Sequence, residues 1–254
     1  MRHKRCLYII LLEDPKFSVG RGKAATKRAA RGTIVQTVST STSALPGESI
    51  AALVDADGTG SASWPVALAY PATPLRDLAD AVHALCALHG MAPSLIEQAS
   101  IAPGAAGATR QWLIDTATVF DEERAMLATL TAAVGPLPST PGQAESEAAI
   151  VAQRHALTML AESRRVGCAI GAAATFLLDW TAIRRILAIA GERVGVIPER
   201  SRLPTDRETI AMLDGLGGGV TVRRAITFGA QQLLAQHRGL WQLLDARASA
   251  RRGH

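Results

Sequence analysis

The chain has 254 residues, only 4% of them aromatic, and carries a formal net charge of +5. Its abundant Ala, Leu, Val and Ile favour an aliphatic core of closely packed helices over a sheet, which prefers β-branched and aromatic residues. The charge is unevenly placed, because residues 1–47 hold nine Lys and Arg against two acidic residues. The rest of the chain is nearly neutral, so pooled charge does not indicate a nucleic-acid surface on the folded part.

Residues 1–47 are expected to form a basic, disordered extension that precedes a single helical domain over residues 48–248. The segment alternates basic residues with Gly, Ala, Ser and Thr, and therefore buries little apolar surface. Three interpretations are open: a solvated tail, an arm that contacts nucleic acid or a membrane surface, and a translation start assigned too early. Residues 249–254 are expected to be a short basic C-terminal tail.

The cysteines and the hydropathy pattern indicate a cytoplasmic protein without a membrane span. Cys6, Cys86 and Cys168 form no CxxC motif and no Cys/His cluster, which is typical of reduced thiols in a reducing compartment. The most apolar segment, Val166–Leu178, has 13 uncharged residues, against the roughly 20 that a membrane span requires. We therefore expect a buried central helix there.

Helical signals follow one another along the domain. Ser49–Val54 is an apolar run compatible with a helix or a strand, and Trp64–Pro71 is expected to be extended because it contains two prolines. Apolar residues at 3-4 spacing then predict helices at about 74–89, 93–100, 109–134, 140–163, 166–190, 206–214 and 221–248. Capping boxes are expected at Thr140–Gln143 and Thr205–Glu208. Six or seven helices with short connections predict an all-α, bundle-like domain.

Several short sequence segments of the domain resemble those of a known family. They are LADAVHALCALHG at 78–90, STPGQAESEA at 139–148, QRHAL at 153–157, LLDW at 177–180 and AQHRGLW at 235–241. Together they resemble an uncharacterised family of small helical bacterial proteins with no assigned activity. The resemblance covers roughly residues 48–248 and implies no functional residue.

Five residues could carry metal chemistry. Glu123 lies in the middle of an apolar stripe, where a carboxylate must be paired, hydrogen-bonded, metal-bound or protonated. His155 occupies a similar place on its helix with Glu162 beyond it, while Asp80 and His83 are spaced i, i+3. Together they could bind iron or another divalent metal, as in ferritin-like bundles, although the chain has no Glu-x-x-His motif. A satisfied buried Glu–His or Glu–Arg pair is the competing interpretation.

The remaining polar signals have structural interpretations. His89, just before Gly90, is expected to bond the last carbonyls of its helix. Asp179 is expected to cap a new helix that starts at Trp180. The Gly167–Gly171 spacing indicates close packing between helices.

The sequence contains no catalytic or nucleotide-binding motif. It therefore favours a non-enzymatic, soluble helical protein without a cofactor, which acts through a protein partner or by self-association as a homo-oligomer. Two alternatives are kept: a ferritin-like carboxylate/His metal-binding bundle, and contact with nucleic acid through residues 1–47.

Overall fold

The computed structural model describes residues 45–253, which form nine α-helices and no strand. In chain order these are α1 Pro46–Asp57, α2 Ser63–Leu68, α3 Leu75–His89, α4 Leu95–Ile101, α5 Gly107–Ala133, α6 Gln143–Ala161, α7 Cys168–Val194, α8 Asp206–Asp214 and α9 Val220–Arg252. The all-α class is confirmed, and the seven helices expected from position 74 onward correspond to α3–α9. The predicted basic extension and its nucleic-acid arm lie outside the described residues, except for 45–47, which begin α1.

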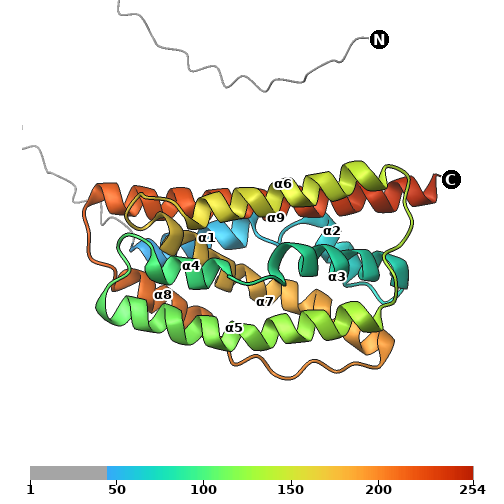
Figure 1. Ribbon diagram of the computed structural model, residues 1–254, viewed down its shortest axis with the longest axis horizontal. Coiled ribbons are helices and arrows are strands. Elements are labelled where there is room, and N and C mark those ends of the chain that lie inside the picture. The colour runs from blue at the N-terminus through green and yellow to red at the C-terminus, as the bar shows by residue number, and fades with distance from the viewer. Residues whose placement is uncertain (1–44, 254) are drawn as a thin grey trace, which may run out of the picture. The chain divides into compact units, whose positions relative to one another are not determined.

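Helix α7 is the central element of the fold. Every residue from Gly167 to Trp180 is buried, which confirms the predicted central helix. The most extensive partner of α7 is α9, and α3, α4, α5 and α6 also contact it. Figure 1 shows α6 and α9 side by side above α7 and α5 below it. Within residues 45–253, no helix is both long enough and apolar enough to cross a membrane.

Glycines let α7 and α9 approach each other closely. A Cβ on Gly171 would lie 2.3 Å from the carbonyl oxygen of Ile226, and one on Gly229 would lie 2.1 Å from that of Cys168. Both distances are too short for any side chain, so the crossing requires glycine in both helices. The Gly167–Gly171 spacing therefore marks helix packing, as predicted.

Two local predictions are wrong. The segment Trp64–Pro71 was expected to be extended, but its residues 64–68 belong to α2 (Ser63–Leu68). Pro65 lies in the first turn of this helix, where a missing N–H costs no helical hydrogen bond. Thr140 does not cap α6, which begins after Gly142 with its left-handed φ of +73° and has no side-chain cap. The second capping box is confirmed, since Thr205 and Glu208 bond each other's backbone N–H groups.

The last helix is longer than the sequence indicates. The pattern of apolar residues predicts an end near Ala248 and a basic tail over 249–254, but α9 continues to Arg252. The reason is electrostatic: Arg251 is buried against two carboxylates of α3, Asp77 and Asp80, so the last turns of α9 have partners in the core. The predicted tail is therefore part of the domain up to Arg252.

Candidate functional site

A fully buried carboxylate lies in the middle of α7, the most apolar helix. Asp179 has no exposed surface, and its oxygens accept hydrogen bonds from the N–H and the hydroxyl of Thr59, both at 2.6 Å. The same carboxylate forms a hydrogen bond with the Nδ1 of His237, on α9, at a distance of 2.6 Å. Asp179 therefore does not cap a new helix at Trp180, as the sequence suggests, but joins the α1–α2 connection to α7 and α9.

These partners keep the Asp179 carboxylate ionised. Burial by itself would raise its pKa, but the hydrogen bond and charge of His237 and the hydrogen bonds from Thr59 lower the pKa below its usual value. The Thr59 hydroxyl in turn accepts the indole N–H of Trp241 at 2.9 Å. Every polar atom around the carboxylate thus has a partner, which is the condition for burying a charge.

The chain of hydrogen bonds continues from His237 to His89. The Nε2 atoms of the two imidazoles are 3.2 Å apart, and His89 is the last residue of α3. The His89 ring does not bond the last helical carbonyls, as expected from the sequence, but packs against Phe176 with ring centroids 4.8 Å apart. Burial, followed by the neighbouring His237, holds the pKa of His89 well below its ordinary value, so its imidazole is neutral.

His89 also lines a cavity of about 790 Å³ between the end of α3, α4, α6 and α7. The buried side chains of Phe120, Phe176 and His89 form its inner end. Exposed side chains form the mouth; they are Met91, Ile101, Arg154 and Glu162. The volume lies within the roughly 300–1,000 Å³ of small-molecule sites, and a mostly apolar lining with few polar groups is typical of them.

Among the residues described, the side-chain oxygen of Gln98 is enclosed and has no hydrogen-bond partner. Gln98 lies on α4 and lines the same cavity as His89. Buried polar atoms are nearly always hydrogen-bonded, so this oxygen is an exception in the interior of the protein.

The five predicted metal ligands do not form one site. Glu123 is buried, but its carboxylate accepts the indole N–H of Trp180 at 3.0 Å and the hydroxyl of Ser201 at 2.7 Å, and pairs with Arg184. His155 is exposed on α6, which is not in extensive contact with α5, the helix of Glu123. Among residues 45–253, no group of three or more His, Cys, Asp or Glu side chains could hold a metal ion.

The other three predicted ligands have separate partners or surroundings, although Asp80 and His83 lie one turn apart on α3. His83 has its Nε2 2.8 Å from the carbonyl oxygen of Gly135. Glu162 is exposed at the mouth of the cavity. Asp80 accepts two bonds from the Nε of Arg247, at 2.9 and 3.0 Å, and one from Arg251 at 2.7 Å. The buried carboxylates thus pair with arginine, the interpretation that competed with metal binding.

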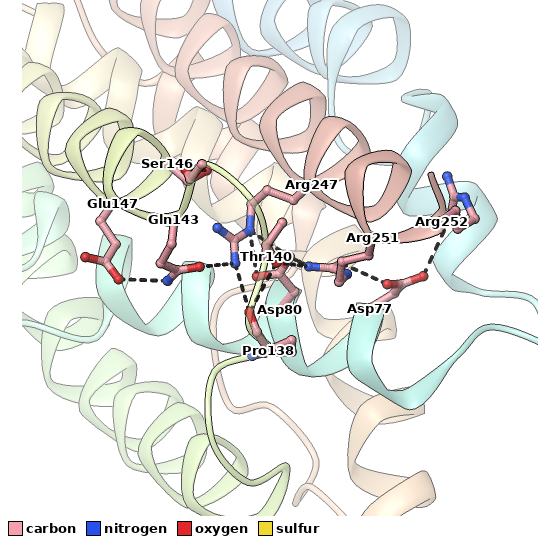
Figure 2. A network of polar contacts seen from close by, with 11 residues as sticks. Asp77, Asp80, Pro138, Thr140, Gln143, Ser146, Glu147, Arg247, Arg251 and Arg252 are labelled. Atoms are coloured by element: carbon pink, nitrogen blue, oxygen red, sulfur yellow. Dashed lines mark hydrogen bonds and ion pairs between the residues drawn. The ribbon is translucent and has the colours of Figure 1, made fainter. Parts of the chain in front are cut away.

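Asp80 belongs to a second buried polar network, which fastens the end of α9 to α3 (Figure 2). Arg251 bridges Asp80 and Asp77 and also donates to the hydroxyl of Thr140 at 2.8 Å. Burial would lower the pKa of Arg251, but its hydrogen bonds to Asp80 and Asp77 raise the pKa above the usual value. Apart from the Nε of Arg251, which is enclosed without a partner among the described residues, its charged groups hold helices together, so we assign this network a structural role.

The substitution Asp80→Asn is expected to lower the free energy of unfolding by about 3 kcal/mol, because it leaves two buried guanidinium groups short of negative charge. Asp57→Asn is the matched control, since Asp57 and Arg238 form an ion pair that is about half exposed. We expect it to cost roughly 0.5 kcal/mol. Urea unfolding of both variants measures the difference, and equal effects would contradict the structural role.

The fold and its polar interior define an all-helical protein in which a buried Asp–His–His chain reaches the inner end of a cavity. Residues 54–252 match the Family of unknown function (DUF6975), and the chain belongs to this family. The matched range contains the whole Asp179 network and every residue that lines the cavity. No curated protein and no solved structure matches the chain significantly.

The sequence contains one indication of this site, the position of His237 on α9. The apolar face of α9 contains Leu233, Leu240 and Leu244, and His237 lies four residues after the first and three before the second. A histidine in such a stripe needs a buried partner, by the same argument that singled out Glu123. Thr59 gave no comparable signal, because it lies in a connection between helices.

Proposed function

We propose that the cavity beside α3, α4, α6 and α7 binds a small, mainly apolar molecule, and that His89 is the polar group that recognises it. The observation that carries the proposal is the position of His89, which is both the end of a buried hydrogen-bond chain and part of the inner wall of the cavity. Burial of the polar side chains of Asp179 and His237 costs free energy unless their polar atoms are hydrogen-bonded. These hydrogen bonds also fix the orientation of the His89 ring. Fixed polar groups in an apolar wall are what small-molecule sites use for specificity.

The lining of the cavity supports an apolar ligand. Leu88, Phe120, Leu157 and Phe176 are buried side chains that contribute to its walls. Ile101 is 80% exposed at its mouth, so apolar surface continues outward from the interior. A ligand that covers these surfaces gains free energy in proportion to the apolar area removed from water.

The substitution Leu157→Trp should fill the cavity from α6 and weaken binding of the neutral dye N-phenyl-1-naphthylamine by roughly tenfold or more. Ala148→Trp, on an exposed position of the same helix that does not line the cavity, is the control and should bind the dye as the wild type does. Dye fluorescence, titrated against each protein, measures both affinities. Saturable binding that is equal in both variants would place the dye elsewhere and contradict the proposal.

Self-association is a second candidate function, favoured by the outer face of α6. Val151 and Met159 are both 56% exposed and lie two helical turns apart, so they share one face. We propose that this face contacts a second copy of the chain.

The double substitution Val151→Glu with Met159→Glu should then convert a dimer to a monomer, because it places like charges in a self-complementary contact. Ala128→Glu, an exposed position on α5, is the control and should leave the dimer intact. Light scattering coupled to size exclusion measures the mass of each. A wild-type protein that is monomeric at every concentration would remove this candidate.

Two further expectations from the sequence remain predictions. Cytoplasmic location is supported by Cys86 and Cys168, which are both free thiols. Contact with nucleic acid through residues 1–47 depends on residues that the structure does not describe, apart from the last three of them.

A further inference from the structure

We infer that one end of the helical domain docks on an anionic lipid membrane surface. This end contains the end of α4, the connection between α6 and α7, and the first turns of α9; Figure 1 shows the beginnings of α7 and α9 far from the C-terminus. We call it the basic end, and its exposed side chains are Ile101, residues 164–166, Val220, Arg224 and Phe228. The inference goes beyond the proposed function of the cavity and does not depend on it.

Apolar side chains are exposed at the basic end. Ile101 is 80% exposed, Val220 53% and Val166 47%. Phe228 is also partly exposed and lies two helical turns after Val220, so the two share one face of α9. Exposed apolar side chains that gather among polar ones mark surfaces that contact a protein or a membrane.

Contacts between the segments make the basic end one continuous surface. The guanidinium of Arg165 lies over the ring of Phe228, 5.1 Å from its centroid, which joins the α6–α7 connection to α9. The N–H of Gly167 donates to the carbonyl of Pro103 at 3.2 Å, which joins the same connection to the residues that follow Ile101. Ile101 also lines the mouth of the cavity, so the basic end and the cavity adjoin each other.

Arginines outnumber acidic residues at the basic end. Residues 163–178 and 215–244 contain no Asp or Glu, and Glu162 is the acidic residue that precedes the first of these ranges. Four arginines come from the same segments: Arg164, Arg165, Arg223 and Arg224. Within residues 45–253, the ion pairs that arginines form with Asp or Glu all involve other arginines. Their charge is therefore available to attract an anionic surface.

The first part of the chain joins the domain close to the basic end. The N–H of Gly47 donates to the carboxylate of Asp214 at 2.8 Å, and Asp214 is the last residue of α8, just before the loop that leads to Val220. Residues 1–44 carry nine Lys and Arg and two acidic residues. A segment of the same sign of charge is thus attached beside an end of the domain that is itself basic.

The combination of charge and apolar surface favours a membrane over a nucleic acid. Phosphates of a nucleic acid would pair with the arginines but would leave Ile101, Val166 and Val220 in water. At a lipid interface, apolar side chains enter the boundary with the acyl chains while basic side chains contact anionic headgroups. The surplus of arginine over acid predicts a preference for anionic over zwitterionic lipid.

Sedimentation of the full chain with sucrose-loaded vesicles tests the inference. Vesicles of phosphatidylcholine alone are compared with vesicles of about three parts phosphatidylcholine to one part phosphatidylglycerol. We expect the wild type to sediment with the anionic vesicles and to stay in the supernatant with the neutral ones. The double substitution Arg165→Gln with Arg224→Gln should weaken binding to anionic vesicles roughly twentyfold, because each basic residue at such a surface contributes about fivefold.

A second double substitution, Val166→Ser with Phe228→Ser, tests the apolar contribution and should weaken binding roughly tenfold. Its control is Val66→Ser with Tyr70→Ser, two exposed apolar residues near the opposite end of α9, where Tyr70 lies beside Arg252.

The control for the arginine pair is Arg76→Gln with Arg185→Gln, at two exposed positions away from the basic end. Arg76 precedes Asp77, which binds Arg251 near the end of α9, and Arg185 lies about 25 Å along α7 from its first residue. Both control variants should bind anionic vesicles as the wild type does.

Three results would overturn the inference. The first is a wild type that does not sediment with anionic vesicles. The second is equal binding by all variants, because residues 1–44 alone would then account for it. The third is loss of binding in the arginine variant without any loss in the apolar one, or tighter binding of a labelled single-stranded oligonucleotide than of vesicles, because the basic end would then recognise a polyanion. Dye binding in the cavity should be unchanged in every variant, so none of these results bears on the proposed function.

Discussion

A carboxylate in the middle of an apolar helix must receive hydrogen-bond donors from the rest of the fold, and Asp179 receives them from two separate segments. Thr59 comes from the connection between α1 and α2, and His237 from α9. His237 then reaches His89 at the end of α3. Because an unpaired buried charge would cost several kcal/mol, these segments must be in place for α7 to pack as it does. The positions of four segments that are distant in sequence therefore depend on one side chain.

Three buried acidic centres are satisfied in different ways, and only one of them is linked to a residue that lines the cavity. Asp80 pairs with arginines of α9, and Glu123 with Trp180, Ser201 and Arg184. In both, the donors come from the packed helices and connections. Asp179 alone is hydrogen-bonded to a chain of imidazoles. An imidazole has two ring nitrogens, so it can bond one partner at each of them. The hydrogen-bond chain that starts at Asp179 ends at His89, which lines the cavity.

Helices α3–α9 could be predicted from the sequence, whereas α2 and the site could not. Apolar residues at 3-4 spacing identified α3–α9, because burial of one face is a local property of each helix. The end of α9 was missed because Arg251 is held by carboxylates on α3, a contact between distant parts of the chain. The same limit applies to the site: periodicity indicates that Asp179 and Glu123 need partners, but not which residues the packing brings to them. His237 was recognisable as a polar residue in an apolar stripe, whereas its pairing with Asp179 depends on how α7 crosses α9.

Asp179 holds His237, and through it His89, in a buried hydrogen-bonded chain, and this dependence can be tested directly. The most direct measurement is the nitrogen-15 chemical shifts of the two imidazole rings by NMR, in the wild type and in Asp179→Asn. We expect His89 to remain neutral as the pH falls through about 6.5, the ordinary imidazole value, and both rings to change their protonation pattern in the variant. A His89 that gains its proton at the ordinary pH, or rings that are unchanged by Asp179→Asn, would contradict the account.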